Sequence, residues 1–286
     1  MAASTAALRG ITKQYKDFTL GPVDMTVPAG SIVGLIGENG AGKTTLLKIL
    51  CGVNRADDGT VDLLGGSPAD AATRAKIGVV FEDAFFYGSF TAAQVARSLA
   101  GMYGARWNAD SFSAYLRRFG LDAGKKLKEY SRGMRLKLSL AAALAHDPEL
   151  LVLDEATAGL DPVVRGELLD LFLEFIQDER HSIVMSSHIT ADLEQIADSI
   201  AYLHNGQLLF QENKDDLLQE YGVLHCGEDV LTSLPAGLVV FTRRRAYGCE
   251  SLVRERRTVQ ELLPEAVCDA ARLDDIMRFY SGRDAQ

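Results

Sequence analysis

GENGAGKTT, at residues 37–45, stands between the apolar run SIVGLIG (31–37) and the helical pattern TTLLKILCG (44–52). It satisfies G-x-x-x-x-G-K-[ST] in the strand-to-helix position that this pattern requires. Glycines in such a loop let backbone N–H groups and the N-terminus of the following helix face a phosphate. A turn that merely joined strand to helix would not need Lys-Thr-Thr after it. The stretch therefore predicts a nucleotide site on an α/β fold.

The side chains at the end of this loop have predictable roles in phosphoryl transfer. Lys43 is expected to reach the β- and γ-phosphates, Thr44 to ligate Mg²⁺ through its hydroxyl, and Thr45 to lie near the α-phosphate. The remaining positions of the cradle are Gly37, Asn39, Gly40, Ala41 and Gly42. Because kinases, GTPases and molecular motors share such a loop, it predicts a nucleotide without naming the chemistry.

A second acidic motif, LLVLDE at 150–155, is an apolar strand that ends in two carboxylates. We expect Asp154 to hold the water shell of Mg²⁺, and Glu155 to orient or deprotonate the attacking water. An Asp-Glu pair could also simply cap the next helix. Its position at the end of a buried strand, 111 residues after Lys43, favours the functional interpretation.

Residues 8 to about 221 alternate short β-branched runs with longer helical patterns, as βα units around a sheet do. Further strands are expected at 77–81, 150–153, 182–186 and 200–204, and residues 92–127 are expected to be helical throughout. The side chains that recur at the spacing of one buried helix face in that segment are Phe112, Tyr115, Leu116 and Phe119.

The pattern changes after Gly222, where runs at 238–242 and 247–253 flank a basic turn at 243–245. These runs predict a hairpin, and LDDIMRFY at 273–280 predicts a final helix. The segment carries nine basic and ten acidic residues, so we expect a solvated, internally paired surface and not a patch for lipid or nucleic acid. We assign it no function.

Composition excludes several classes of protein. The 286-residue chain has a net charge of −9, which argues against a nucleic-acid-coating role, because phosphate contacts need clustered Lys and Arg. Its four cysteines contain no C-x-x-C pair, so neither a zinc knuckle nor a disulfide framework is indicated. We see no signal peptide and no run of ~18 apolar residues, so any membrane role is expected to come through a partner.

The order of the remaining motifs indicates a family. YSRGM at 130–134 precedes a helix, AGLD at 158–161 follows Glu155, and His188 closes the strand SIVMSS. With the phosphate loop and LLVLDE, this order closely resembles the ABC ATPase family from residue 8 to about 221. The resemblance implies a P-loop NTPase fold with an ABC-type ATPase core (1–221), including a helical subdomain segment (84–127), and a small C-terminal α+β extension (222–286).

The resemblance implies further site residues. In that family two subunits face each other head to tail around two ATP molecules, so Ser131 and Gly133 would contact the nucleotide of the opposite subunit. Both suit a γ-phosphate at a helix N-terminus. His188 would sense the γ-phosphate, although a packing role at a strand end is the alternative. Asp161 would communicate between sites, and before Pro162 it can also start a helix.

Tyr15 and Glu82 complete the set of expected site residues. Tyr15 stands where the family stacks an aromatic ring on adenine, with an ordinary strand aromatic as the alternative. Glu82 occupies the family's Q-loop position, where it replaces Gln, with a solvated loop residue as the alternative. The signature also departs from LSGGQ, since Arg132 and Met134 replace Gly and Gln. This form resembles a bacterial branch of ABC-2-type exporters.

The resemblance also implies cofactors and partners. We expect ATP and Mg²⁺, a second ABC ATPase subunit that is identical or related, and a separate transmembrane permease docked on 84–127. No nucleic-acid partner is expected, and the chain would lie on the cytoplasmic face of the membrane. Rival hypotheses are an ABC ATPase acting on ribosomes or DNA, and a partner subunit with little turnover. One phosphate loop, no long coiled coil and an intact Glu155 disfavour them.

Overall fold

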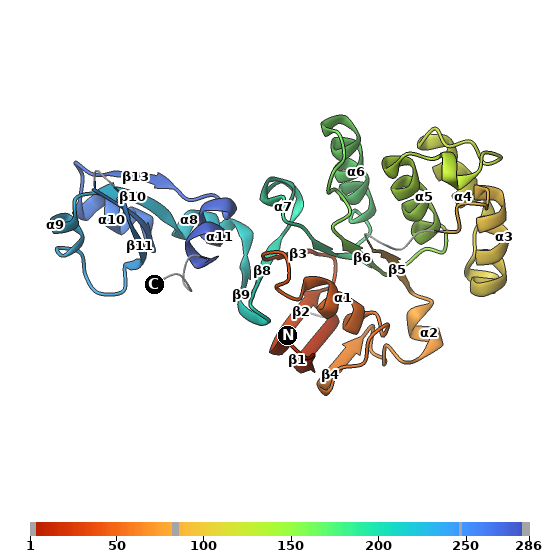
Figure 1. Ribbon diagram of the computed structural model, residues 1–286, viewed down its shortest axis with the longest axis horizontal. Coiled ribbons are helices and arrows are strands. Elements are labelled where there is room, and N and C mark those ends of the chain that lie inside the picture. Colours follow the sequence, from red (N-terminus) through yellow and green to blue (C-terminus); the bar gives the residue numbers. More distant parts are fainter. Residues whose placement is uncertain (1–3, 82–85, 246–247, 282–286) are drawn as a thin grey trace.

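The computed structural model describes residues 4–81, 86–245 and 248–281, and its centre is a six-stranded sheet (Figure 1). The strand order is β5 (Ile77–Val80), β6 (Leu150–Asp154), β7 (Ser182–Ser186), β3 (Ile32–Ile36), β8 (Ser199–His204) and β9 (Gln207–Asn213). The first five are parallel, and β9 pairs antiparallel with β8. Strands β3, β6 and β7 are buried along their whole length, as expected for a sheet covered on both faces.

Helices cover the two faces of this sheet in different ways. Helix α1 (Lys43–Leu50) lies on one face beside the sheet β2 (Thr19–Pro28), β1 (Ser4–Gln14) and β4 (Asp58–Leu63), near the short α2 (Ala71–Arg74). Helices α5 (Arg132–Leu144), α6 (Pro162–Phe175) and α7 (Thr190–Ile196) lie on the other face (Figure 1). Each face has its own cluster of buried apolar side chains.

The segment expected to be helical throughout is broken into shorter pieces. It contains α3 (Ala92–Tyr103), a 3-10 turn (Gly104–Arg106), α4 (Ala109–Arg118) and a second 3-10 turn (Leu127–Glu129). The expectation that residues 92–127 are helical throughout was wrong, because Gly104 is the C-cap of α3 and Asn108 caps α4 through its side chain. Of the predicted stripe, Phe112 and Leu116 are buried, and Tyr115 and Phe119 are partly buried against the same apolar cluster.

The C-terminal part forms a four-stranded antiparallel sheet in the order β11 (Val239–Arg245), β12 (Gly248–Val253), β10 (Gly222–Cys226) and β13 (Val267–Ala270). It also holds α9 (Glu228–Leu231) and α10 (Arg256–Leu262). The predicted hairpin is present as β11 and β12, but its basic triplet is not the turn. Residues 243–245 belong to β11 and pair with β12. Among the described residues, Arg244 and Arg278 form ion pairs with Glu228 and Glu250, as expected for a paired surface.

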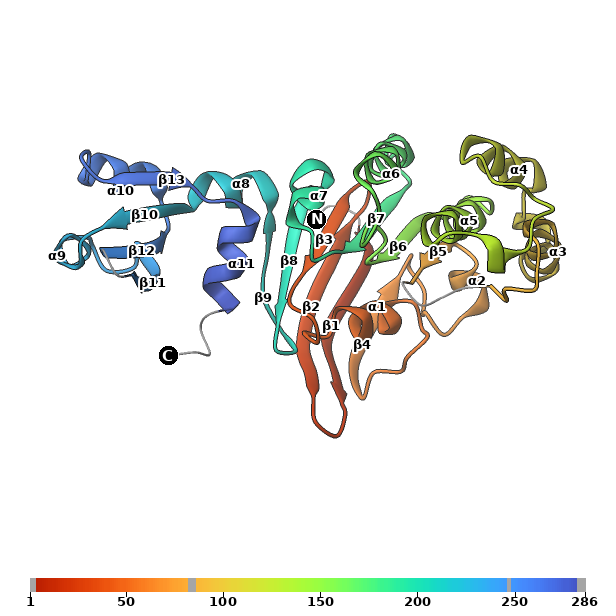
Figure 2. The ribbon, with the colours of Figure 1, turned by 45° about the horizontal axis from the view of Figure 1, so that its top comes forward.

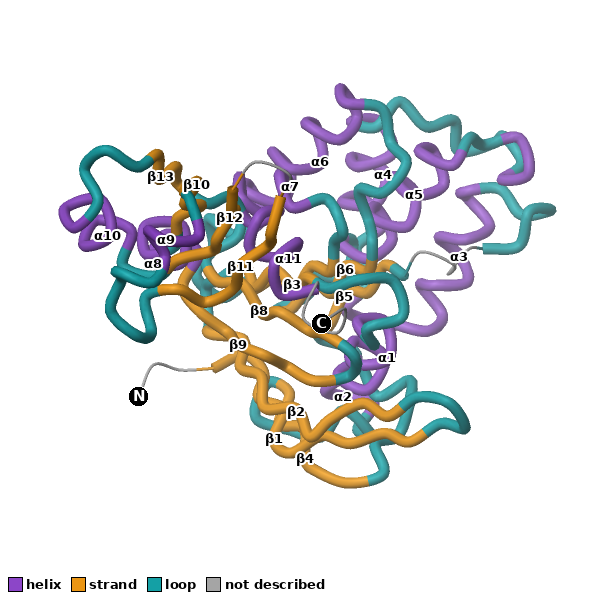
Figure 3. The backbone as a smooth tube through the Cα atoms, turned by 60° about the vertical axis from the view of Figure 1, so that its left-hand side comes forward, coloured by secondary structure: helices purple, strands orange, loops and turns teal. Residues whose placement is uncertain are grey.

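This extension packs against the central sheet through its last helix. Helix α8 (Lys214–Glu220) leads into β10, and α11 (Leu273–Ser281) returns beside β8 and β9 (Figures 2 and 3). The ring of Tyr280 meets the rings of Tyr202 and Phe210 edge-on, at centroid distances of 5.7 and 5.6 Å. Its hydroxyl lies 3.2 Å from that of Tyr221. Residue 221 lies between the two sheets and the apolar core continues across it, so a domain boundary there stays a prediction.

No helix in the described parts of the chain combines the length and apolar character needed to span a membrane.

Candidate functional site

The phosphate loop joins β3 to α1 and needs glycine where it turns. Gly42 is the N-cap of α1 with φ 107°, in the left-handed region that favours glycine. A Cβ on Gly42 would lie 2.9 Å from Cζ of Phe18, so that ring would have to shift to admit a side chain. The loop therefore leaves the N-terminus of α1 open to a phosphate, which its N–H groups and dipole favour.

Lys43 is buried at the first position of α1, and its ammonium group lies inside the loop. Its Nζ donates hydrogen bonds to the carbonyl oxygens of Gly37 (2.8 Å) and Glu38 (3.2 Å). It also lies 3.4 Å from Oε1 of Glu155. The loop's own carbonyl oxygens and one carboxylate thus hold this buried cation. A bound phosphate can replace these partners with its own oxygens.

Thr44 and Asp154 join the loop to strand β6. The Thr44 hydroxyl donates to Asp154 Oδ2 at 2.7 Å, and the Ser186 hydroxyl donates to Asp154 Oδ1 at 2.6 Å. Asp154 is only 2% exposed, so this carboxylate has a fixed orientation in a region shielded from solvent. Hard oxygen donors of this kind are the ligands that Mg²⁺ prefers. The pair predicted to hold magnesium is therefore assembled, and its chemistry fits that ion.

Burial raises the pKa of the Cys51 thiol to about 12, and the negative charge of Asp154 adds to the effect. Cys51 follows the last residue of α1 and is almost fully buried. A thiol with so high a pKa stays neutral at physiological pH, and only the thiolate is nucleophilic. The thiol beside the site therefore has a packing role.

Glu155 follows β6 in the left-handed backbone conformation, with φ 52°. Its N–H donates to the carbonyl and hydroxyl oxygens of Ser186, both at 3.1 Å, which fixes this uncommon conformation. The side chain is only 11% exposed, and its Oε1 is buried without a hydrogen bond in the described structure. A buried carboxylate oxygen with unused acceptor capacity suits a group that receives a proton from water.

His188 binds the other oxygen of this carboxylate. His188 Nδ1 lies 2.6 Å from Glu155 Oε2, and the His188 N–H donates to the same atom at 3.3 Å. The imidazole is 52% exposed, so its other ring nitrogen can meet a ligand. The two strand ends of β6 and β7 thereby present an acid–base pair at one edge of the sheet.

The signature residues lie at the start of another helix. Ser131 is the N-cap of α5 and accepts a hydrogen bond from the N–H of Met134 at 3.2 Å. Ser131 is exposed, and Gly133 lies in the first turn of the same helix. None of the hydrogen bonds or ion pairs described above for Lys43, Thr44, Asp154, Glu155 and His188 comes from either residue. Ser131 and Gly133 therefore contribute none of the contacts described for these five site residues.

The remaining predicted residues have different outcomes. Asp161 caps α6 by accepting from the N–H groups of Val163 (3.1 Å) and Val164 (3.0 Å), so the capping alternative is correct and the role between sites stays a prediction. Tyr15 follows β1 and is 42% exposed, which leaves its ring available to a base. Glu82 lies outside the described residues.

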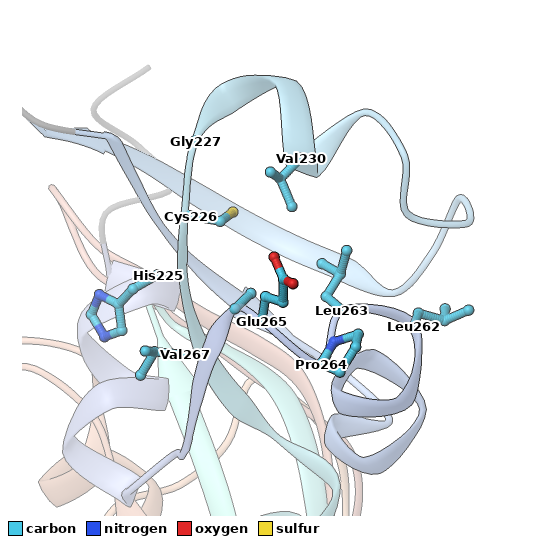
Figure 4. Close-up of a pocket in the computed structure, with 10 residues that line it drawn as sticks. His225, Cys226, Gly227, Val230, Leu262, Leu263, Pro264, Glu265 and Val267 are labelled. Carbon is cyan, nitrogen blue, oxygen red and sulfur yellow. The ribbon is translucent and has the colours of Figure 1, made fainter.

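A separate groove of about 500 Å³ lies in the C-terminal extension, between α9, α10 and β13 (Figure 4). Its walls include Val230, Leu263 and Val267, with the carboxylate of Glu265 and the thiol of Cys226 (Figure 4). No residue predicted from the motifs lines it. The groove and the phosphate loop are therefore separate features.

Ser186 is a site residue that the sequence analysis missed. It bonds both Asp154 and the backbone of Glu155, and so connects the two carboxylates. The signal was available, because a polar pair at 186–187 interrupts the apolar run of β7 just before His188. Polar residues at the carboxyl end of a parallel strand often belong to a site.

Comparison with known proteins agrees with this geometry. A family model described as ABC transporter matches residues 20–158. The bacitracin transport ATP-binding protein of Enterococcus faecalis is 36% identical over 212 residues, which are 72% of this chain and 68% of that protein. The lantibiotic transport ATP-binding protein of Streptococcus pyogenes is 31% identical over 241 residues, which are 83% of this chain and 99% of that protein.

Coverage differs among the relatives. An uncharacterized ABC transporter ATP-binding protein of Synechocystis is 38% identical over 206 residues, and the chain spans 58% of that protein's length. Among solved structures, an ATP-binding subunit of an ABC transporter is 28% identical with a TM-score of 0.68, covering 75% of this chain and 92% of that one. An ATP-binding cassette bound to ADP and phosphate, at 23% identity and TM-score 0.66, covers 73% of this chain and 98% of that one and supports the fold alone. The chain belongs to the ABC transporter family, and the relatives that it resembles are named as ATP-binding proteins.

Proposed function

We propose that this chain is the motor of an exporter, in which it binds and hydrolyses ATP to drive a separate transmembrane permease. Two relatives matched over most of this chain are named for bacitracin transport and lantibiotic transport. The chain would lie on the cytoplasmic face of the membrane and be attached through the permease. We expect the permease, and not this chain, to select the exported substrate.

One observation carries the proposal: Lys43, Thr44, Asp154, Glu155 and His188 converge from α1, β6 and β7 at one edge of the sheet. In this arrangement a cation, a hydroxyl, two carboxylates and an imidazole surround the N-terminus of a helix. These are the groups that phosphoryl transfer to water uses, because that reaction depends on positioning and charge neutralisation.

The roles of these side chains follow from their present contacts. The Lys43 ammonium exchanges loop carbonyls for phosphate oxygens, and this exchange releases Glu155 Oε1. Glu155 then orients the attacking water and accepts its proton, while His188 holds the carboxylate through Oε2. When bound, a Mg²⁺ ion held by Thr44 and Asp154 would neutralise charge on the β- and γ-phosphates. Tyr15 would stack on adenine.

A second ATPase subunit would complete each site. Ser131 at the start of α5 is exposed, and it presents a hydroxyl at a helix N-terminus, an arrangement suited to a γ-phosphate. The phosphate loop of a partner, whether a second copy or a related chain, would bring that phosphate. Closure then follows ATP binding, and opening follows loss of the γ-phosphate bridge.

The rival assignment is an ABC ATPase that acts on DNA or ribosomes. DNA-acting relatives would need long coiled coils between the phosphate loop and the signature. Here the helices of that region that the structure describes are short: α3 has 12 residues and α4 has 10. We therefore favour the permease as partner, docked on the segment 84–127, of which residues 84 and 85 lie outside the described structure.

The test uses a Glu155→Gln variant, which should bind ATP and remain closed. The tagged variant is expressed in its own cells, membranes are solubilised with ATP present, and proteins that stay bound are identified by mass spectrometry. Lys43→Ala with the same tag is the control, because it should not hold ATP. Enrichment of a multi-span membrane protein over this control supports the proposal. Enrichment of ribosomal or chromosomal proteins instead would refute it.

A further inference from the structure

Arg132 replaces a glycine of the usual signature, and its side chain turns back onto its own chain. A Cβ placed on Gly159 would lie 3.2 Å from Nη1 of Arg132 and 3.5 Å from its Cζ. The guanidinium therefore lies against the α-carbon of Gly159, in the turn that connects β6 to α6. Gly159 has φ 69°, so both its conformation and this contact favour glycine.

This turn is hydrogen-bonded to the backbone of Glu155. The N–H of Ala158 donates to the carbonyl oxygen of Glu155 at 3.1 Å, and the N–H of Leu160 donates to that of Thr157 at 3.4 Å. A displacement of Gly159 would consequently move the backbone that carries Glu155. From the other side, Nη2 of Arg165 on α6 donates to the carbonyl oxygen of Leu160 at 3.3 Å. One short turn thus accepts a hydrogen bond from Arg165 and lies against the guanidinium of Arg132.

Arg132 also lines a narrow cleft with Asp154, Glu155 and Ala158. It is the first residue of α5, where a positive charge is unfavourable because the helix dipole is positive at that end. Two carboxylates, those of Asp154 and Glu155, line the same cleft. Arg132 therefore lies beside the catalytic carboxylates of its own chain.

We infer that Arg132 is a positioning residue, which holds the turn 156–161 and through it Glu155 of its own chain. It would not act mainly on the nucleotide that its neighbours Ser131 and Gly133 meet across the dimer. The inference rests on the proposed head-to-tail pairing of two ATPase subunits. Arg132 would therefore affect the hydrolytic step and not the binding of ATP.

The first test separates turnover from binding. We expect Arg132→Gly to lower kcat by ~10-fold with the KM for ATP changed less than ~2-fold, because a small misplacement of a catalytic group affects mainly the chemical step. Arg132→Lys should restore part of the loss. Lys137→Ala is the control, since Lys137 lies on the same helix but pairs with Glu167. Wild-type kcat in Arg132→Gly, or a loss confined to KM, would overturn the inference.

The second test assigns the effect to one chain of the pair. Two differently tagged copies are co-purified with ATP, and one of them carries Glu155→Gln, so that only the other copy's Glu155 can hydrolyse. Arg132→Gly is then placed on either copy. The inference predicts the loss of kcat when Arg132→Gly is on the copy with intact Glu155. A loss only when it is on the Glu155→Gln copy, which supplies the signature to the active site, would overturn it.

The two proposals fail in different ways in this experiment. If the tagged copies do not co-purify, the pairing of two copies of this chain is refuted, and the kcat of the single Arg132→Gly variant then decides the role of Arg132. If they co-purify and neither placement lowers kcat, the pairing stands and the role of Arg132 is refuted. Unfolding midpoints of all variants are measured, so that loss of folded protein is not read as loss of kcat.

Discussion

His188 Nδ1 lies 2.6 Å from Glu155 Oε2, which joins the end of β7 to the end of β6. The backbone N–H of His188 donates to the same oxygen, so the carboxylate is held at two points from one residue. The opposite oxygen of Glu155 faces Lys43 at 3.4 Å. The Glu155 carboxylate therefore lies between His188, which fixes its orientation, and Lys43, which a bound phosphate can draw away.

Replacing His188 by Ala should impair turnover more than binding. We expect kcat to fall by ~10²-fold, the usual effect of removing one preorganised hydrogen-bonding group from a catalytic site, with ATP affinity nearly unchanged. Steady-state ATPase assays and equilibrium nucleotide binding measure the two quantities. His225→Ala is the control, because His225 is exposed on β10 in the extension. Equal kcat for both variants would remove His188 from the site.

Replacing Thr44 by Val should raise the Mg²⁺ requirement. The change keeps the shape of the side chain but removes the hydroxyl that bonds Asp154 at 2.7 Å. We expect the Mg²⁺ concentration for half-maximal activity to rise by ~10-fold or more, because one oxygen ligand is lost. Thr26→Val, on an exposed position of β2, is the control. An unchanged Mg²⁺ titration would contradict the assignment.

Replacing Tyr15 by Ala should weaken ATP binding and spare kcat. Loss of aromatic stacking costs about 0.5–1.5 kcal/mol, which corresponds to a rise in KM of roughly 2- to 12-fold. Tyr15→Phe keeps the ring and should behave like the wild type. Tyr87→Ala serves as a control, because that ring is also exposed and has no predicted nucleotide role. A KM for ATP that is the same in Tyr15→Ala and wild type would reject the stacking role.

The stability of the fold should decrease in mild acid because of His146. Burial lowers the pKa of His146 below its ordinary value of 6.5, against the opposing effect of its hydrogen bond to the Ile77 carbonyl. The folded protein then binds fewer protons than the unfolded chain, so the free energy of unfolding falls as pH drops through about 6.5 towards the folded pKa. We expect a flatter pH dependence of Tm in His146→Gln.

The control for this prediction is His225→Gln, which removes an exposed histidine from the extension. That variant should keep the wild-type slope of Tm between about pH 7.5 and about pH 5.5. An equally steep slope in His146→Gln and the control would show that His146 does not contribute to the acid sensitivity.

The fold was predictable where the pattern is strong and local. The strands β3, β6 and β7 are buried apolar runs, so their positions could be read from the sequence to within a residue or two. The sheet of β1, β2 and β4 was missed, although β2 alternates buried and exposed positions as a half-buried strand does. The break between α3 and α4 was missed because helix periodicity continues across Gly104, whereas the cap at Asn108 starts a new helix.

The candidate site was predictable in its residue types but not in its connections. Lys43, Thr44, Asp154 and Glu155 could be named from motifs, and the structure brings them together. Ser186 stands out in the sequence as a polar residue in an apolar run, but its bond to Asp154 depends on the pairing of β6 with β7, which aligns the two residues. The contact of Arg132 with Gly159 likewise arises from tertiary packing between α5 and the turn after β6. Side-chain contacts between distant segments need the fold.

The central claim is that ATP closes two subunits across a site whose hydrolytic group is Glu155. The most direct measurement is the molar mass of purified Glu155→Gln with ATP and Mg²⁺, determined by light scattering after gel filtration. The account predicts twice the mass of one chain, reverting to the single-chain mass when Lys43→Ala is added. A single-chain mass under all conditions, with ATP turnover equal to the wild type, would contradict it.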